Sequence, residues 1–360
     1  MSAMGLKPVK KQQQRKTKTT DGKGRHTSSQ SKHRQHHHRQ HHHHHQQQHP
    51  EQRKEFNFPS ISLKTQLDYA RNGHTVLRNF IDPTLLATME QDAVQYMSTK
   101  ELQAWRQKVE VASDSAELAA SCRSAQDCQS TLQRLGIYDS LPFLQFFNAW
   151  RDVQSIRELC FALGETAATL LDVPSVRLYQ DSLLLKRSGD GPTPWHLDAR
   201  MAPFDTSHMV TLWIPFHTVD ETGLLFVPKS HNDFALPYWN SLDGTEYTRL
   251  EERYRHKVKH HMPLQLGDAT VHSGWTLHCA DGNTSSKDRM AIAVSFVDSA
   301  AEIRQEAIGT SIDGTEAVEG NGKGYGDNED KWSYQDWVRD VPTRQPFDHP
   351  MVPIVWPRQD

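Results

Sequence analysis

The sequence predicts an α+β fold: helices come first, an antiparallel jelly roll or barrel follows, and the helices pack on one face of the β part. Two observations predict it. Before Pro174, apolar residues recur at the spacing of amphipathic helices. After Pro174, short segments rich in β-branched and aromatic residues alternate with turns of Gly, Pro and Asp, as in jelly rolls. We expect a single domain over residues 55–360, with a helical part at about 60–172, a jelly roll at about 174–300 and a C-terminal wrap at 301–360.

Residues 1–54 are predicted to be a basic, Gln- and His-rich disordered tail, because they hold too little apolar surface to offset the entropy cost of ordering. Residues 1–55 carry 13 Lys and Arg against three acidic residues, and they contain 11 of the 22 histidines. The rest of the chain has a net charge of −13, which brings the total to −3. We expect a solvated segment, with weak contact to polyanions or metal ions as the functional alternative and no specific contact with nucleic acid.

The first helix with a clear start signal begins at Asp82-Pro83. Asp is a favoured N-cap residue, and Pro fits the first turn because its missing N–H needs no partner there. Apolar side chains then follow at helical spacing as far as Met97. Further helices are expected at residues 100–111, 125–135 and 156–170.

Strands are expected wherever β-branched and aromatic residues form short runs after Pro174. Turn sequences such as Ser188-Gly189-Asp190-Gly191-Pro192 separate these runs. The C-terminal stretch is rich in turn residues and contains Trp332, Trp337 and Trp356, so we expect it to cover the core as extended chain. The expected strands are residues 176–185, 210–216, 224–227, 269–271 and 290–296.

Cysteine content and hydropathy indicate the class of compartment. Four cysteines are too few to cross-link 360 residues, and no two of them have C-x-x-C metal spacing, which favours a reducing compartment. No apolar run approaches the ~18 residues of a membrane span, and no secretory signal is seen. The chain ends in Arg358-Gln359-Asp360 and not in a peroxisomal tripeptide of the Ser-Lys-Leu type. We expect a cytoplasmic protein, with the nucleus as the alternative.

A candidate metal site begins at His196-Leu197-Asp198, where an imidazole and a carboxylate stand two residues apart and would share one face of a strand. His278 is the best third ligand, since Arg289 follows it across a turn-forming loop. A hairpin there would place His278 and Arg289 on neighbouring strands. Two histidines and one carboxylate leave three positions open on Fe(II), as a bidentate 2-oxo acid and dioxygen require. The planar guanidinium of Arg289 suits a second carboxylate.

Taken alone, this spacing is not specific. A His-x-Asp sequence occurs by chance in many chains, and a surface hydrogen bond is its ordinary explanation. His272 lies six residues before His278, an even spacing that permits the same strand face, but we expect it to line the barrel or to form a hydrogen bond. The pair Ser230-His231 is expected to stabilise a turn after a strand.

Many further motifs surround these residues in a consistent order. Over roughly residues 65–300 they resemble the phytanoyl-CoA dioxygenase family, whose members are Fe(II)- and 2-oxoglutarate-dependent oxygenases on a double-stranded β-helix, a cupin-like jelly roll. The motifs are Gln180-Asp181-Ser182, Lys186 and Pro192 before Trp195-His196-Leu197-Asp198, Met201-Ala202-Pro203-Phe204-Asp205, Thr211-Leu212-Trp213-Ile214-Pro215, Gly223-Leu224-Leu225-Phe226-Val227-Pro228-Lys229-Ser230-His231, Gly267-Asp268, and His278 followed by Gly282-Asn283 and Arg289.

The resemblance implies a dioxygenase that uses Fe(II), 2-oxoglutarate and O2, releases succinate and CO2, and hydroxylates an aliphatic C–H bond of a small organic or lipid-like molecule. The carboxylate of Asp198 favours hydroxylation over halogenation, because related halogenases carry a small residue there. The implied iron ligands are His196, Asp198 and His278, the implied partner of the distal 2-oxoglutarate carboxylate is Arg289, and Gln180 and Trp213 are implied to line the co-substrate pocket.

Two residues depart from the pattern of some relatives, since Ala280 replaces a hydroxyl-bearing residue and Leu197 replaces Gln, so fewer co-substrate contacts are expected. The alternative function is a catalytically inactive sensor of the same fold that binds metal or metabolite without turnover. The identity of the substrate, whether it is a CoA thioester, and the oligomeric state are not encoded in any motif found.

Overall fold

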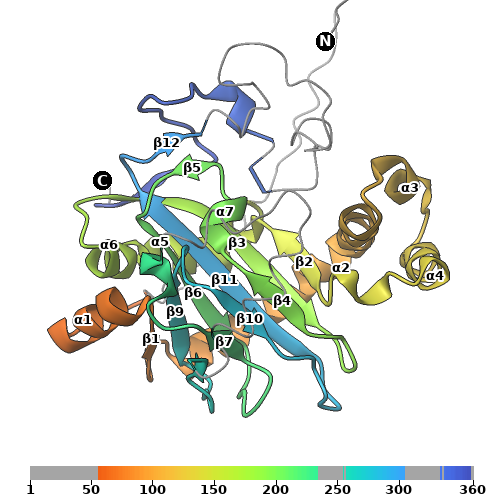
Figure 1. Cartoon of the computed structure of the whole chain (residues 1–360), viewed down its shortest axis with the longest axis horizontal. Coiled ribbons are helices and arrows are strands. Elements are labelled where there is room, and N and C mark those ends of the chain that lie inside the picture. The colour runs from red at the N-terminus through yellow and green to blue at the C-terminus, as the bar shows by residue number, and fades with distance from the viewer. Residues whose placement is uncertain (1–55, 234–253, 255–256, 305–332, 335, 358–360) are drawn as a thin grey trace, which may run out of the picture. The chain divides into compact units, whose positions relative to one another are not determined.

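The computed structural model describes residues 56–233, 254, 257–304, 333–334 and 336–357 (Figure 1). All of them belong to one structural unit, Lys54–Asp360. The predicted tail of residues 1–54 lies outside the described residues, as does the stretch 305–332 of the predicted C-terminal wrap.

The helical part starts with α1 (Leu63–Asn72) and continues in α2 (Pro83–Ser113). As predicted, Asp82 is the N-cap of α2: its carboxylate accepts a hydrogen bond of 2.8 Å from the backbone N–H of Thr84. The two helices predicted on either side of residue 99 are one continuous helix of 31 residues. The Thr99 hydroxyl donates back to the carbonyl of Tyr96 at 2.7 Å, so this polar residue sits in the helix without breaking it.

The predicted helix over residues 156–170 forms two helices, α5 and α6, that meet at Leu163. Gly164 opens α6 where another segment approaches closely, because a Cβ atom there would lie 3.0 Å from the carbonyl oxygen of Val355. Within the described residues, no helix has both the length and the apolar character needed to cross a membrane. The helices that follow α2 are α3 (Ala116–Ser121), α4 (Ala125–Leu135), α5 (Gln154–Ala162), α6 (Gly164–Leu171) and α7 (Asp198–Met201).

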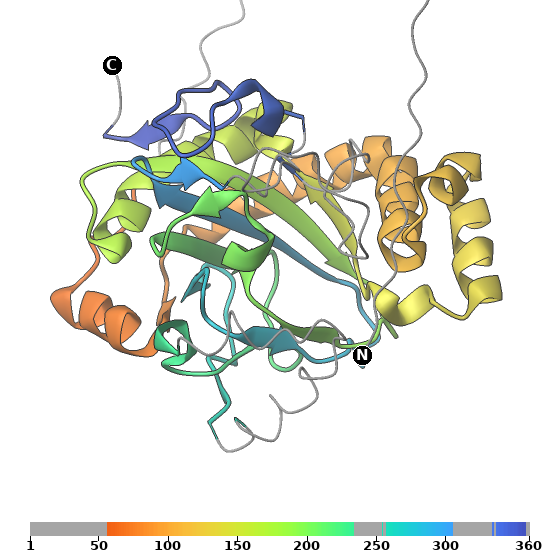
Figure 2. The same cartoon turned by 45° about the horizontal axis from the view of Figure 1, so that its top comes forward.

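Two antiparallel sheets form the jelly roll, which confirms the predicted α+β fold; they lie one over the other (Figure 2). The larger sheet has the order β1-β9-β6-β11-β3-β13, with β2 also paired to β3, and the smaller has the order β4-β10-β7-β8. The larger sheet contains β1 (His74–Leu77), β2 (Leu144–Phe147), β3 (Val176–Lys186), β6 (Met209–Pro215), β9 (Ala269–Ser273), β11 (Arg289–Asp298) and β13 (Ile354–Trp356). The smaller contains β4 (Thr193–His196), β7 (Leu224–Phe226), β8 (Lys259–His260) and β10 (His278–Ala280), and β5 (Phe204–Asp205) pairs separately with β12 (Glu302–Ile303).

Three strands of the larger sheet, β1, β2 and β13, come from outside the segment predicted to form the jelly roll. Each has only three or four residues, which is too short for a periodic signal in the sequence. Their backbone groups find partners only when the sheet assembles; β1, for example, pairs with β9 in a register that sets His74 opposite His272.

The main core lies between the larger sheet and the helices. On one face of β3 and β11, Leu178, Leu183 and Ile292 pack with Leu159 and other side chains of α5 and α6, all of them fully buried. Complete burial of such a side chain contributes roughly 1.5–3 kcal/mol. The helices therefore fix one face of the larger sheet, and the opposite face is turned toward the smaller sheet.

Gly267 provides a test of the contact between the start of α2 and the turn before β9. Its φ is +100°, and a Cβ atom would lie 2.5 Å from the carbonyl oxygen of Ile81. We expect Gly267→Ala to lower the free energy of unfolding by about 2–3 kcal/mol, through backbone strain and this collision. Gly136→Ala is the matched control, since Gly136 has a φ of +67° but nothing within 4 Å of a Cβ, and it should cost only about 1 kcal/mol. If urea denaturation gave the two variants an equal loss of the free energy of unfolding, this account would be wrong.

Candidate metal centre

A cavity of about 340 Å³ lies between the two sheets, a size typical of small-molecule sites. Side chains of β3, β6 and β11 line it from the larger sheet, and side chains of β4, β7 and β10 line it from the smaller sheet. All six site residues inferred from the sequence line this cavity: Gln180, His196, Asp198, Trp213, His278 and Arg289.

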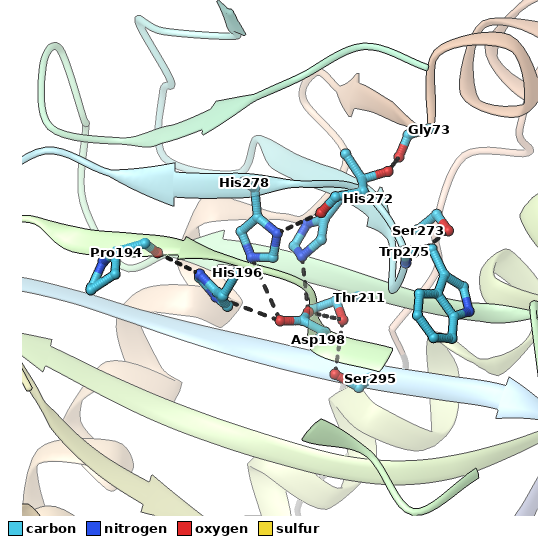
Figure 3. Close-up of polar contacts among 11 residues, drawn as sticks. Gly73, Pro194, His196, Asp198, Thr211, His272, Ser273, Trp275, His278 and Ser295 are labelled. Carbon is cyan, nitrogen blue, oxygen red and sulfur yellow. Dashed lines mark hydrogen bonds and ion pairs between the residues drawn. The ribbon is translucent and has the colours of Figure 1, made fainter. Parts of the chain in front are cut away.

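Three of these residues meet at one point (Figure 3). The ligand atoms of His196, Asp198 and His278 all lie within 4.8 Å of one another. His196 and His278 are directly paired across β4 and β10, and the Oδ1 atom of Asp198 lies 3.7 Å from Nε2 of His196 and 3.6 Å from Nε2 of His278. Within the described residues, this is the one group of His, Cys, Asp or Glu with metal-binding spacing.

The local backbone differs from the expectation that His196 and Asp198 share a strand. Strand β4 ends at His196, and Asp198 is the first residue of α7. The prediction of a shared face still succeeds because Leu197, between them, keeps an extended backbone with φ −127° and ψ 119°. Two side chains two residues apart along extended chain point the same way, whether or not the chain is paired in a sheet.

Backbone carbonyl groups orient both imidazoles. Nδ1 of His196 lies 2.8 Å from the carbonyl oxygen of Pro194, and Nδ1 of His278 lies 2.9 Å from that of Thr276. A carbonyl oxygen only accepts, so in each ring Nδ1 carries the hydrogen. Each Nε2 is then left with its lone pair directed at the meeting point, the arrangement that metal-binding histidines use.

Asp198 uses its two oxygens differently. Its Oδ2 atom accepts hydrogen bonds from the hydroxyl of Thr211 at 2.8 Å and from Nε2 of His272 at 3.0 Å, while Oδ1 faces the other two imidazoles. His272 thus lines the barrel and forms a hydrogen bond, as expected from the sequence.

The electrostatics set the protonation states that a cation requires. Burial alone would raise the pKa of Asp198, but the nearby imidazoles of His278, His272 and His196 hold this pKa well below its usual range. Burial, followed by the neighbouring histidines, lowers the pKa of His278 well below its ordinary value. At neutral pH the site therefore presents a carboxylate and, at His278, a neutral imidazole, which are the metal-binding forms.

The Arg289 guanidinium is buried on β11 at one end of the cavity, with its central carbon 5.6 Å from the ring centroid of Trp213. Its Nη1 atom has no hydrogen-bond partner among the described residues. Burial lowers the pKa of Arg289 to about 10. The predicted hairpin between His278 and Arg289 is wrong, because β10 belongs to the smaller sheet and β11 to the larger one. The two residues instead line one cavity from opposite sheets.

A second buried cation, Lys186, is one of the family motif residues but is not among the six site residues inferred from the sequence. It stands directly opposite Arg289 in the pairing of β3 with β11 and is only 1% exposed. Its Nζ donates to the hydroxyl of Thr193 at 3.2 Å, and burial together with Arg289 lowers its pKa to about 8. Polar residues at alternate positions of a strand, such as Gln180, Ser182 and Lys186, are the signal that would have placed it on the cavity face.

Gln180 and Trp213 lie on β3 and β6. Gln180 is half-buried, and its side-chain oxygen accepts a hydrogen bond from the hydroxyl of Ser333. The pairing of β3 with β11 shifts register near Ser295, so the neighbours Tyr179 and Gln180 both line the cavity despite the alternation of a regular strand. Trp213 is 2% exposed and forms the wall beside Arg289.

The family model "Phytanoyl-CoA dioxygenase (PhyH)" matches residues 69–291. Among curated proteins, none matches the chain.

Solved structures similar to this one include two non-heme alpha ketoglutarate dependent enzymes from nogalamycin biosynthesis. The carbocyclase SnoK is 19% identical, with 82% of this chain and 96% of that chain covered and a TM-score of 0.50. The epimerase SnoN, in complex with Fe3+, alpha ketoglutarate and nogalamycin RO, is 20% identical, with 81% and 97% covered and a TM-score of 0.53. At this identity the likeness shows the fold.

A histidine at the edge of the site predicts a pH dependence of stability. His74 packs on the ring of Phe226, its Nδ1 lies 2.8 Å from Nε2 of His261, and burial lowers its pKa from 6.5 to about 3. Between pH 6.5 and 3 the unfolded chain binds a proton at this residue that the folded chain does not, so this contribution to stability is complete above pH 6.5 and is lost as the pH falls. The free energy of unfolding, measured by urea denaturation, should fall between pH 7.5 and pH 5.0. This fall should be roughly 1–2 kcal/mol smaller in His74→Phe than in wild type. An equal fall in the variant and in wild type would show that His74 does not titrate in this way.

Proposed function

The chain belongs to the phytanoyl-CoA dioxygenase family, and from this premise we propose that it is an Fe(II)- and 2-oxoglutarate-dependent dioxygenase that hydroxylates an aliphatic C–H bond of a small organic molecule. The observation that carries the proposal is the meeting of His196, Asp198 and His278 in one cavity with the buried guanidinium of Arg289. A 2-oxoglutarate-dependent oxygenase follows from membership of the family, and hydroxylation is the reaction that we propose for it.

The three ligand residues fit a divalent iron ion. Two neutral imidazole nitrogens and one carboxylate oxygen form the set used by non-haem Fe(II) oxygenases. The hydrogen bonds to Pro194 and Thr276 hold the two rings with Nε2 free, so little reorganisation accompanies metal binding. When bound, iron supplies the activation of O2, coupled to conversion of 2-oxoglutarate into succinate and CO2.

Arg289 and Lys186 fit the distal carboxylate of 2-oxoglutarate. Two buried cations on paired strands repel each other, and Nη1 of Arg289 has no hydrogen-bond partner in the part of the chain that the structure describes. An anion that reaches both cations therefore relieves an unfavourable arrangement. The planar guanidinium binds a carboxylate through two parallel hydrogen bonds. Trp213 packs beside the guanidinium of Arg289, and in this proposal Gln180 contributes a further polar contact from the cavity wall.

The rest of the cavity suits an apolar substrate. Val111 of α2, Phe143, Phe147 of β2 and Met201 of α7 contribute apolar surface to its wall. Such a wall excludes water from the reacting C–H bond and holds the substrate by contact area. These residues therefore support a small, largely apolar molecule as the substrate class.

The test is an anaerobic titration of the full chain with Fe(II) and then 2-oxoglutarate, followed by absorption. The visible charge-transfer band of an iron-chelated 2-oxo acid should appear in wild type and be absent in His196→Ala and His278→Ala, which lose a ligand. His208→Ala, an exposed position, is the control and should keep the band. Iron held by histidines of residues 1–54 does not produce this band unless 2-oxoglutarate is chelated to it, so the ligand variants also measure that background. Bound iron without a band in folded wild type would instead favour the sensor.

Lys186 predicts how 2-oxoglutarate binding depends on pH. With a pKa of about 8, Lys186 is mostly charged at pH 7 and mostly neutral at pH 9, and only the charged form attracts a carboxylate. The 2-oxoglutarate concentration that gives half of the band should therefore rise several-fold from pH 7 to pH 9. In Lys186→Met it should be about tenfold higher at pH 7 and nearly constant with pH. Lys287→Met, at an exposed position, should behave as wild type; a wild-type pH response in Lys186→Met would refute this role.

A further inference from the structure

Five strands of the larger sheet carry polar side chains in a single row on the face that meets the cavity. By strand register, His74 of β1 stands opposite His272 of β9, His272 opposite Thr211 of β6, Thr211 opposite Ser295 of β11, and Ser295 opposite Gln180 of β3. A polar row through the middle of a buried sheet is costly unless its members are hydrogen-bonded. The members nearest the metal centre form such bonds, and the bonds converge on Asp198.

The direction of each bond in this row follows from the chemistry of the groups. An ionised carboxylate only accepts, so the hydroxyl of Thr211 and the Nε2–H of His272 must both donate to Oδ2 of Asp198. Thr211 has one hydroxyl hydrogen, and it is used in this bond. Ser295, whose hydroxyl oxygen lies 3.0 Å from that of Thr211, must therefore be the donor in the bond between them. The chain of donors runs from Ser295 through Thr211 to Asp198.

These two hydrogen bonds occupy Oδ2 of Asp198 and do not involve Oδ1. A carboxylate beside a divalent cation binds through one oxygen or through both, and binding through both uses an additional position on the metal. Here Oδ2 already accepts two hydrogen bonds from adjacent strands, whereas Oδ1 is the atom that faces His196 and His278. Rotation that brought Oδ2 to a metal would break both bonds.

We propose that His272 and Thr211, supported by Ser295, are positioning residues that hold Asp198 so that only Oδ1 is offered to the metal. This inference rests on the proposed function and deepens it, because single-oxygen binding keeps three metal positions open for 2-oxoglutarate and O2. None of the three residues is itself a ligand: His272 lies outside the group with metal-binding spacing, and its Nε2 carries a hydrogen that points to Oδ2.

The surroundings make the three residues rigid, as positioning requires. His272, Thr211 and Ser295 are each no more than 3% exposed, so water does not compete for their hydrogen bonds. The ring of His272 packs against those of Phe226 and His278, with centroid distances of 5.5 Å and 4.3 Å. All three are on strands of the larger sheet, whose far face is packed against helices.

Paired variants separate the hydrogen bond from packing. His272→Leu and Thr211→Val remove the donor and keep the volume, whereas His272→Gln and Thr211→Ser keep a donor. In the full chain under anaerobic conditions, we expect His272→Leu and Thr211→Val to weaken Fe(II) binding 10- to 100-fold and to shift or abolish the charge-transfer band with 2-oxoglutarate. His272→Gln and Thr211→Ser should retain the band, and Ser295→Ala should show an intermediate loss. Melting temperatures of the metal-free variants show whether each is folded.

A wild-type band and affinity in folded His272→Leu would overturn the proposal, as would equal loss in His272→Leu and His272→Gln, which would assign the effect to ring packing. Co(II) absorption distinguishes this failure from failure of the proposed function. Co(II) reports its ligands without 2-oxoglutarate, and subtracting the His278→Ala spectrum removes the contribution of the His-rich tail. If wild type gives no band with 2-oxoglutarate, the proposed function fails. A Co(II) difference spectrum that changes in His272→Leu and is retained in His272→Gln still supports the positioning role in that case.

Discussion

The ionised carboxylate of Asp198 is the group on which the site depends. It lies where two sheets meet, in surroundings that disfavour a negative charge. Its Oδ2 atom accepts hydrogen bonds from the hydroxyl of Thr211 and the Nε2–H of His272, and its Oδ1 atom faces the imidazoles of His196 and His278. Each of these groups needs a specific strand register: His196 opposite His278 in the smaller sheet, and Thr211 opposite His272 in the larger one. A shift of one residue in any of these strands would turn the side chain concerned to the other face. The same strand registers therefore determine both the fold and the site.

A second constraint acts at the opposite end of the cavity. Lys186 and Arg289 are buried side by side without a carboxylate within ion-pair distance among the described residues. Unpaired buried cations destabilise a folded protein, and here they are retained in a cavity that also holds a metal-binding set. The charge arrangement, anionic near the histidines and cationic near Trp213, matches a molecule that chelates a metal at one end and carries a carboxylate at the other. The apolar wall between α2, β2 and α7 leaves space for a substrate without competing for either charge.

The larger sheet connects these constraints to the rest of the molecule. One face packs on α5 and α6 through a continuous apolar core, so the strands have little freedom to move relative to one another. The other face carries the polar row and the cations. The short strands β1, β2 and β13 widen the sheet beyond the jelly roll, and β2 brings Gln145 and Phe147 to the cavity wall.

Local patterns in the sequence were sufficient for the helix start at Asp82, for the strands around Val210 and Ile292, and, with the family motifs, for the identity of the six cavity residues. Each of these depends on neighbours within a few positions, where periodicity, capping and motif spacing act. The assignment of β10 and β11 to different sheets, the exposure of Oδ1 and not Oδ2, and the pairing of Lys186 with Arg289 have no such signal. His272 lies 74 positions from Asp198, and Arg289 lies 103 positions from Lys186. Such contacts exist only after the sheets have assembled, because hydrogen-bond partners across strands are chosen by register and burial and not by the residues beside them.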